Sequence, residues 1–256
     1  MPDLVRVVPH DAGALWQVTF GSGNGNILDR ATMRELARVF VDARAASDLK
    51  AICLEGAGGD FSFGASVQEH QIEHVQSMLE TLRGLVLDLL DCHVPTLAAV
   101  RGRCLGGGLE LVAICHRVFA TTEAKFGQTE IALGVFPPLA SIVLPERVGR
   151  ALAEELCLSG RTMPAAEAHG IGLVNELVEG DALEAAREWA ETRLMPHSAS
   201  SLRFAVRAIR ASLANRIRVE LPEIEKLYLE ELMATADANE GVRAFLEKRR
   251  PTWKNR

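Results

Sequence analysis

The fold prediction starts from residues 104–134, which read CLGGGLELVAICHRVFATTEAKFGQTEIALG. A glycine-rich turn leads into the helix-like run GLELVAI, and the strand-like run RVFATT follows over residues 117–122. Two glutamates, Glu110 and Glu130, stand among apolar neighbours. A buried carboxylate is costly unless it is paired or functional. The stretch therefore predicts an alternation of helix and strand and also a candidate active site.

The sequence on either side continues this alternation. Short runs rich in β-branched and aromatic residues predict strands at 4–8, 14–20, 50–56 and 94–100. Helical spacing of apolar residues predicts helices at 30–46, with Asp29 as N-cap, and at 66–91. From Ala182 onward the chain is helical almost to its end. We expect an α/β fold of repeated ββα units, with a core over residues 1–195 and a helical C-terminal region over 196–256.

Composition excludes several classes of protein. The chain has 256 residues, of which 48% are hydrophobic and 24% charged, as in a soluble globular protein with a sizeable core. Its formal net charge of −6 argues against a nucleic-acid partner, because phosphate binding needs clustered Lys and Arg. No signal-peptide core or membrane-spanning run is found, so we expect a cytoplasmic protein with no membrane partner. The five scattered cysteines form no C-x-x-C pair and are expected to be small buried hydrophobes.

In two segments, small residues stand at the junction between a predicted strand and a predicted helix: FSFGAS at 61–66 and CLGGGLEL at 104–111. The first N–H groups of a helix lack partners within it and lie at the positive end of its dipole. Two such groups that converge would form an oxyanion hole for a thioester enolate. The alternative is that Gly106, Gly107 and Gly108 only permit tight helix–strand packing, and the glycines alone do not decide between the two. Dinucleotide, P-loop and nucleophile-elbow motifs are absent from the sequence.

The glutamates favour acid–base chemistry. Glu110 lies about one helical turn from Gly107. Two carboxyls that share a dry pocket titrate together, with one held protonated near neutral pH. Addition of water needs such a pair, because one group takes a proton from water and the other supplies one to carbon. A pair of ordinary ion-paired glutamates is the alternative.

Several motifs, taken in order, resemble the crotonase (enoyl-CoA hydratase/isomerase) superfamily over nearly the whole chain. FSFGAS is similar to the F-x-x-G-A-D segment of that family, LGGGLEL to its L-G-G-G-x-E-L, and FGQTEIALG to its F-G-x-P-E-x-x-L-G. Residues 158–178 resemble its L-T-G-x-x-x-x-A-x-x-A-x-x-x-G-L-V stretch, and residues 240–254 resemble its E-G-x-x-A-F-x-E-K-R ending. The resemblance implies a ββα superhelix core followed by a helical trimerisation region.

The resemblance also implies roles for single residues. The backbone N–H groups of Ala65 and Gly107 would form the oxyanion hole, Glu110 would act as the base towards water, and Glu130 would deliver the proton to the α-carbon. Coenzyme A would be part of the substrate, with no separate cofactor and no metal. Homotrimers or homohexamers are expected, with C-terminal helices that close over coenzyme A. The expected coenzyme A contacts are Ala65, Phe245 and Lys248, although Lys248 has a solvated helix-end charge as its alternative.

The acyl pocket is where the sequence departs from the family pattern. GVFPPLAS at 134–141 replaces the family's G-x-x-P-G-x-G-G, and Pro138 stiffens that loop. Ser66 and His116 stand where Asp is usual in the family. GASVQEH and GVFPP most resemble the cyclohexa-1,5-diene-1-carbonyl-CoA hydratases of anaerobic aromatic degradation. The expected acyl-pocket residues are Val67, His70, Phe136, Pro137 and Leu139.

His70 and His74 share the helical spacing of the zinc motif H-E-x-x-H, but residue 71 is Gln. A position at the rim of the acyl pocket is therefore favoured over a metal site.

Four functions remain open at this stage. The favoured one is hydration of a conjugated acyl-CoA, possibly cyclic, in aromatic degradation. A generic enoyl-CoA hydratase of fatty-acid β-oxidation is the first alternative. A double-bond isomerase that uses Glu130 alone is the second, although such enzymes often lack a glutamate at the position of Glu110. A non-catalytic scaffold for a protein or RNA partner is the third, and the acidic net charge argues against it.

Overall fold

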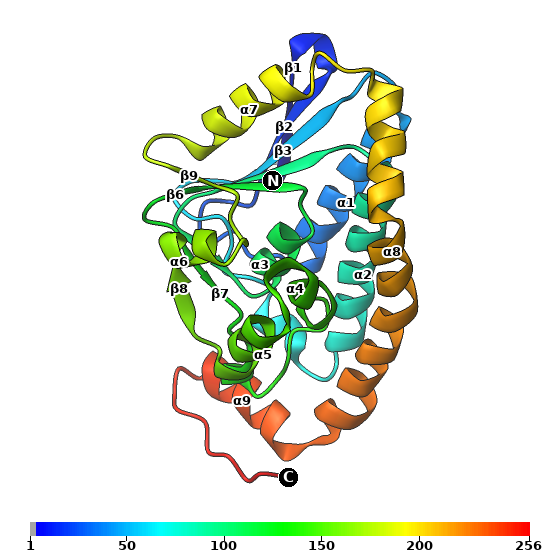
Figure 1. Cartoon of the computed structure of the whole chain (residues 1–256). Helices are drawn as coiled ribbons and strands as arrows, with labels where there is room; N and C mark the ends of the chain where they lie inside the picture. The colour runs from blue at the N-terminus through cyan, green and yellow to red at the C-terminus, as the bar shows by residue number, and fades with distance from the viewer. Residues whose placement is uncertain (1–3) are drawn as a thin grey trace.

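A computed structural model describes residues 4–256 of the chain and contains two β-sheets (Figure 1). In the larger sheet β1 runs antiparallel to β2, and every other neighbouring pair is parallel. Its strands, in spatial order, are β1 (Val5–His10), β2 (Leu15–Phe20), β3 (Ala51–Gly56), β4 (Thr96–Val100), β6 (Arg117–Thr121) and β9 (Glu176–Val178). The smaller sheet contains β5 (Arg103–Leu105), β7 (Lys125–Gly127) and β8 (Thr162–Pro164).

Helices cover both faces of the larger sheet. On β3, Ile52 and Leu54 pack into the main core with the apolar residues of α1 and α2, whereas Ala51 and Cys53 pack on the opposite face with α7. Because alternate residues of a strand point to opposite faces, a strand buried on both faces is apolar throughout. The helices are α1 (Arg30–Ala45), α2 (Val75–Cys92), α3 (Gly107–Ala113), α4 (Ala140–Val148), α5 (Arg150–Ser159), α6 (Ala165–Gly170), α7 (Ala182–Arg193), α8 (Ala199–Lys226) and α9 (Ala236–Leu246).

Most of the predicted elements are confirmed. The strands expected at 4–8, 14–20, 50–56, 94–100 and 117–122 are present within two residues at each end. The helix expected at 30–46 is α1, and the Asp29 carboxylate accepts a hydrogen bond from the Thr32 amide at 2.8 Å, as an N-cap does. The α/β class with a helical C-terminal region is likewise confirmed.

The single helix expected over 66–91 is wrong. A short 3₁₀-helix, η2 (Val67–His70), ends at Gln71, whose backbone is extended, and α2 begins only at Val75. The Glu69 carboxylate accepts hydrogen bonds from the Arg30 amide at 3.0 Å and from Arg30 Nε at 2.9 Å. This contact joins η2 to the start of α1, away from a continuous line with α2.

The smaller sheet was also missed. Its three strands have three residues each, and β5 lies inside the segment that was expected to be only a turn. Strands this short carry too few residues to display a period of two.

The C-terminal helices pack along the core and then reach the end that carries Glu130. α8 contacts α2 and α4, and α9 contacts η2 and a second 3₁₀-helix, η3 (Glu130–Leu133). A β-carbon on Gly241 of α9 would lie 2.1 Å from the Leu133 carbonyl oxygen, so only glycine permits this approach. The division of the chain at residue 195 stays a prediction. No helix within residues 4–256 combines the length and the hydropathy that crossing a membrane requires.

Candidate active site

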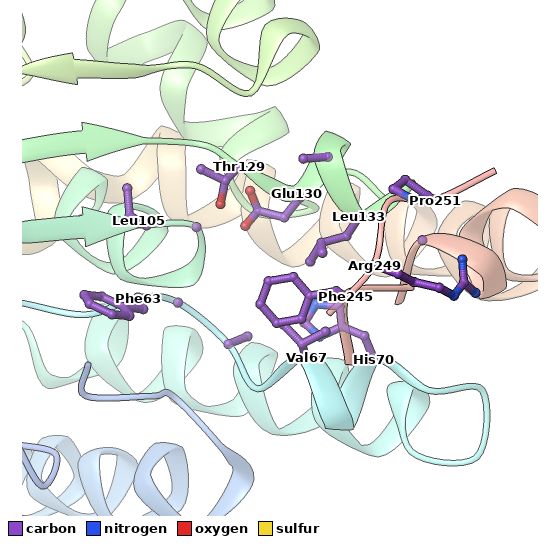
Figure 2. Close-up of a pocket in the computed structure, with 15 residues that line it drawn as sticks. Phe63, Val67, His70, Leu105, Thr129, Glu130, Leu133, Phe245, Arg249 and Pro251 are labelled. Carbon is purple, nitrogen blue, oxygen red and sulfur yellow. The ribbon is translucent and has the colours of Figure 1, made fainter. Parts of the chain in front are cut away.

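A cavity of about 360 Å³ lies where α9, η2, η3 and the turn before α3 meet (Figure 2). Phe63, Val67 and His70 border it on one side, and Glu130 and Leu133 border it on the other. Its wall is completed by α9 and the residues that follow it, with Phe245, Arg249 and Pro251. Segments far apart in the sequence therefore enclose one mainly apolar space.

The two predicted oxyanion donors lie together at this cavity. A β-carbon on Gly107 would lie 3.2 Å from the Ala65 amide nitrogen, and one on Gly64 would lie 3.1 Å from the Gly107 amide nitrogen. Gly107 is the first residue of α3, so its N–H has no acceptor within the helix. The Ala65 N–H donates to no backbone carbonyl within residues 4–256. Two neighbouring amides without backbone partners form the arrangement that an oxyanion hole needs.

The three consecutive glycines differ in the atoms that a β-carbon at each position would meet. Gly106 has φ +51°, and a β-carbon there would lie 2.7 Å from Glu130 Oε1. A β-carbon on Gly108 would lie 2.7 Å from the Ser62 side chain, which is a packing contact. Tight packing therefore explains Gly108, whereas Gly106 leaves room for a carboxylate.

Glu110 is buried in α3, with 3% of its surface exposed. Its Oε1 accepts a hydrogen bond from the Ala140 amide at 2.8 Å, at the first residue of α4. No Lys, Arg or His within residues 4–256 forms an ion pair with it. The carboxyl is thus held by the loop at 134–139 and the start of α4, not by a cation.

Glu130 opens η3 and faces the cavity. Its Oε1 accepts a hydrogen bond from Gln128 Nε2 at 3.0 Å, while its buried Oε2 has no hydrogen-bonding partner within residues 4–256. Like Glu110, it forms no ion pair in the described part of the chain. The alternative of ordinary ion-paired glutamates is therefore ruled out for these residues.

Burial raises the pKa of both carboxyls above 4.5. For Glu110, hydrogen bonds from the Ala140 and Leu139 amides oppose the increase in pKa. For Glu130, the negative charge of Glu110 raises the pKa further. Of the two groups, Glu130 is the one more readily kept protonated.

The predicted acyl-pocket residues divide into two sets. Val67 and His70 line the cavity, and His70 is buried with its Nδ1 2.8 Å from the Ser66 carbonyl oxygen. Burial lowers the pKa of His70 and favours its neutral form. Phe136, Pro137 and Leu139 do not line the cavity, although all three belong to the loop that holds Glu110. Their role in the acyl pocket stays a prediction.

The predicted coenzyme A contacts also differ in position. Ala65 and Phe245 line the cavity, and Phe245 is 55% exposed. Lys248 is exposed and lies outside the cavity wall, so its role stays a prediction. Arg249 lines the cavity but pairs with Glu240 and Glu247.

Two residues near the glutamates were missed. Gln128 is fully buried and orients Glu130 through its amide. Its signal in the sequence was a polar side chain two positions before Glu130 in an apolar stretch. Tyr228 is fully buried behind Phe136, and no motif pointed to it.

Comparison with known proteins identifies the family. Residues 11–256 match the Enoyl-CoA hydratase/isomerase family profile. The chain is 49% identical over 244 residues to a cyclohexa-1,5-dienecarbonyl-CoA hydratase of Thauera aromatica, with 95% of this chain and 94% of that protein covered. It is 36% identical to a probable enoyl-CoA hydratase of Rhizobium meliloti, with 90% of each chain covered.

A solved structure shows the same fold. The crystal structure of an enoyl-CoA hydratase from Mycobacterium avium subsp. paratuberculosis K-10 superimposes with a TM-score of 0.86 at 25% identity and covers 99% of each chain. The family and fold predicted from the motifs are thus confirmed. This chain belongs to the enoyl-CoA hydratase/isomerase family.

Proposed function

We propose that this protein is an acyl-CoA hydratase whose substrate is a cyclic conjugated dienoyl thioester, cyclohexa-1,5-diene-1-carbonyl-CoA. The observation that carries the proposal is the meeting of two carboxyls without ion pairs and two adjacent amides without backbone partners at or beside one cavity. Hydration of a conjugated thioester needs both pairs of groups, because the carboxyls transfer protons and the amides stabilise the enolate.

The proposed reaction begins with the thioester carbonyl oxygen, which accepts hydrogen bonds from the Ala65 and Gly107 amides. Glu110, as carboxylate, takes one proton from water while the oxygen of that water bonds to the β-carbon. The electron pair of the double bond moves to the carbonyl oxygen and forms an enolate. Protonated Glu130 then delivers its proton to the α-carbon. A proton passed from Glu110 to Glu130 restores the starting state.

Two observations support a cyclic acyl group: the name of the relative at 49% identity, and the loop beside Glu110. The relative at 49% identity is a hydratase of such a thioester by name. Pro137 and Pro138 are both buried in the loop that holds Glu110. Because proline fixes φ, this loop is stiffer than the glycine-rich loop of ordinary family members and favours one rigid acyl shape.

The assembly and setting belong to the same proposal. α8 carries apolar side chains that are exposed in the single chain: Phe204, Ile209 and Val219. They support contact with further copies in a homotrimer or homohexamer, with Phe245 and Lys248 against coenzyme A. The reaction written above requires no metal and no cofactor other than the substrate's own coenzyme A. We propose a cytoplasmic enzyme without nucleic-acid or membrane partners.

The test mixes the purified protein with the cyclic dienoyl-CoA and, separately, with crotonyl-CoA, and follows loss of the conjugated thioester absorbance. We expect turnover of the cyclic substrate with a larger kcat/KM than that of crotonyl-CoA. A preference for crotonyl-CoA would favour a generic fatty-acid hydratase, and no turnover of either would refute the hydratase.

Water labelled with ¹⁸O separates hydration from isomerisation. We expect the label at the β-carbon of the product, detected by mass spectrometry. A rearranged double bond without label would indicate an isomerase that uses Glu130 alone. Salt-sensitive RNA binding without any turnover would indicate a non-catalytic scaffold.

A further inference from the structure

Tyr228 is a buried polar residue that the proposed reaction does not yet use. It is the only tyrosine of the chain and lies in a π-helical turn, η4 (Leu227–Glu231), between α8 and α9. It is 1% exposed, and its hydroxyl has no hydrogen-bonding partner within residues 4–256. Most buried hydroxyls are hydrogen-bonded, and an unpaired one destabilises the fold. The phenol therefore needs a hydrogen-bonding partner that the described residues do not supply.

The phenol packs against the loop that contacts both glutamates. Its ring meets the Phe136 ring edge-on, with centroids 5.1 Å apart. One residue before Phe136, the Val135 amide donates to the Glu130 carbonyl at 3.3 Å. At the other end of the loop, the Ala140 amide donates to Glu110 Oε1. Tyr228 thus packs on a loop that bonds the backbone of Glu130 at one end and the carboxyl of Glu110 at the other.

The charges of the site act on the phenol as well. Burial raises the pKa of Tyr228, and the carboxylates of Glu130 and Glu110 raise it further. The phenol therefore remains a neutral O–H donor at every working pH.

Other buried polar atoms near Glu130 also lack partners. Glu130 Oε2 and Gln128 Oε1 have none within residues 4–256. Gln128 Oε1 is an acceptor, whereas the phenol and the protonated carboxyl of Glu130 can each donate and accept. A small molecule with both O–H donors and an acceptor oxygen, such as water, would satisfy such a set.

The cavity wall reaches Glu130 but includes neither Glu110 nor Tyr228. A water that hydrogen-bonds with both Glu130 and the phenol would therefore lie beyond this wall, beside Glu130. The same position is the one from which water would add to the β-carbon in the proposed reaction.

We propose that the Tyr228 hydroxyl donates a hydrogen bond to the oxygen atom that enters the site as water and leaves as the product's hydroxyl group. The phenol orients a lone pair of that oxygen while Glu110 accepts one of its protons. This inference rests on the proposed hydratase function. It adds a third side chain to the two glutamates, one that comes from the C-terminal region.

The first test is Tyr228→Phe, which keeps the ring and its contact with Phe136 and removes only the hydroxyl. We expect kcat to fall about tenfold, which corresponds to ~1.4 kcal/mol for one hydrogen bond. KM for the acyl-CoA should change less than about twofold, because the thioester contacts remain. The melting temperature should change little, because the hydroxyl bonds to no other protein group within residues 4–256.

Glu225→Gln is the matched control on the same segment. Glu225 is buried three residues before Tyr228 and pairs with Arg83. Its loss should lower the melting temperature and leave kcat unchanged. A fall in kcat in Glu225→Gln equal to that in Tyr228→Phe would attribute both effects to segment packing and overturn the inference.

A second measurement uses the single tyrosine of the wild-type protein and does not depend on any variant. Labelling tyrosine with ¹³C at Cζ yields one signal from Tyr228 in the NMR spectrum. The 3-hydroxyacyl-CoA product should shift this signal, and coenzyme A without an acyl group should not. An unmoved signal, or full kcat in Tyr228→Phe, overturns the inference while the hydratase stands. No turnover by the wild type overturns the proposed function and the inference with it.

Discussion

The surroundings of the two glutamates differ: Glu110 is buried and Glu130 is half-buried, and neither forms an ion pair in the described part of the chain. Glu110 belongs to α3, and its carboxylate accepts a hydrogen bond from the amide of Ala140, the first residue of α4. Glu130 is held by one side-chain amide, that of Gln128, and its second oxygen has no partner within residues 4–256. The first carboxyl is fixed by backbone, and the second is fixed at one oxygen only.

This difference separates the proposed base from the proposed acid. Backbone N–H groups and the positive end of a helix favour the ionised form of Glu110. Burial and the charge of Glu110 favour the protonated form of Glu130. The two side chains are identical, and their neighbours alone make Glu130 the one more readily kept protonated.

The largest expected effect comes from replacing each carboxyl by an amide. Glu110→Gln and Glu130→Gln should each lower kcat by about 100-fold or more, because general acid–base catalysis contributes about 10²–10⁴-fold. Binding of coenzyme A, measured by calorimetry, should be unchanged. Near-normal turnover in either variant would remove that residue from the mechanism.

Deuterium exchange sharpens the comparison between these two variants. With the 3-hydroxyacyl-CoA product in D₂O, Glu110→Gln should still exchange the α-hydrogen, since Glu130 alone handles that proton. Glu130→Gln should not. The reverse pattern, read by NMR, would exchange the two assigned roles.

A smaller effect is expected from Gly106→Ala. A β-carbon there would meet Glu130 Oε1 at 2.7 Å and would also be strained by the positive φ. We expect kcat to fall about 10–100-fold through displacement of the carboxylate. Gly84→Ala, in α2 with nothing within 4 Å of the added carbon, is the control and should stabilise the protein by about 0.5–1 kcal/mol. Equal kcat in the two variants would show that Gly106 does not make room for Glu130.

The smallest expected effect is on stability, and it depends on pH. The pKa of Glu130 is raised from 4.5 to about 8 in the folded protein, so the folded state binds this proton more tightly than the unfolded state. Its contribution to stability is full below pH 4.5 and is lost as the pH rises towards 8. The melting temperature of Glu130→Gln should therefore equal that of the wild type at pH 4.5 and exceed it by some degrees at pH 8.5. Circular dichroism at both values measures this, and an equal difference at the two pH values would contradict the raised pKa.

Local patterns predicted the regular elements well and the exceptions badly. α1 was predictable because its apolar spacing and its N-cap, Asp29, both act within the helix. The break between η2 and α2 was not, because no Gly or Pro stands in residues 67–75 and the cause is a contact between Glu69 and Arg30. Contacts between segments far apart in sequence leave no periodic trace.

For the site, the motifs predicted the residues that lie within them and missed the residues that only tertiary packing brings near. Ala65, Gly107, Glu110 and Glu130 stand in the quoted motifs, and the structure gathers them at or beside one cavity. Tyr228 meets the loop beside the glutamates only because η4 packs against Phe136. A residue in a helical C-terminal stretch gives no sign in sequence of which distant loop it will meet.

The bond between Glu110 and the first amide of α4 has a consequence for mutational tolerance. In a library selected only for folded protein, position 110 should keep acceptors such as Glu, Gln or Asp, because an unpaired buried amide destabilises the fold. Position 130 should accept Gln freely under the same selection. Persistence of an acidic residue is therefore evidence of catalysis at 130, whereas at 110 it also reflects the architecture.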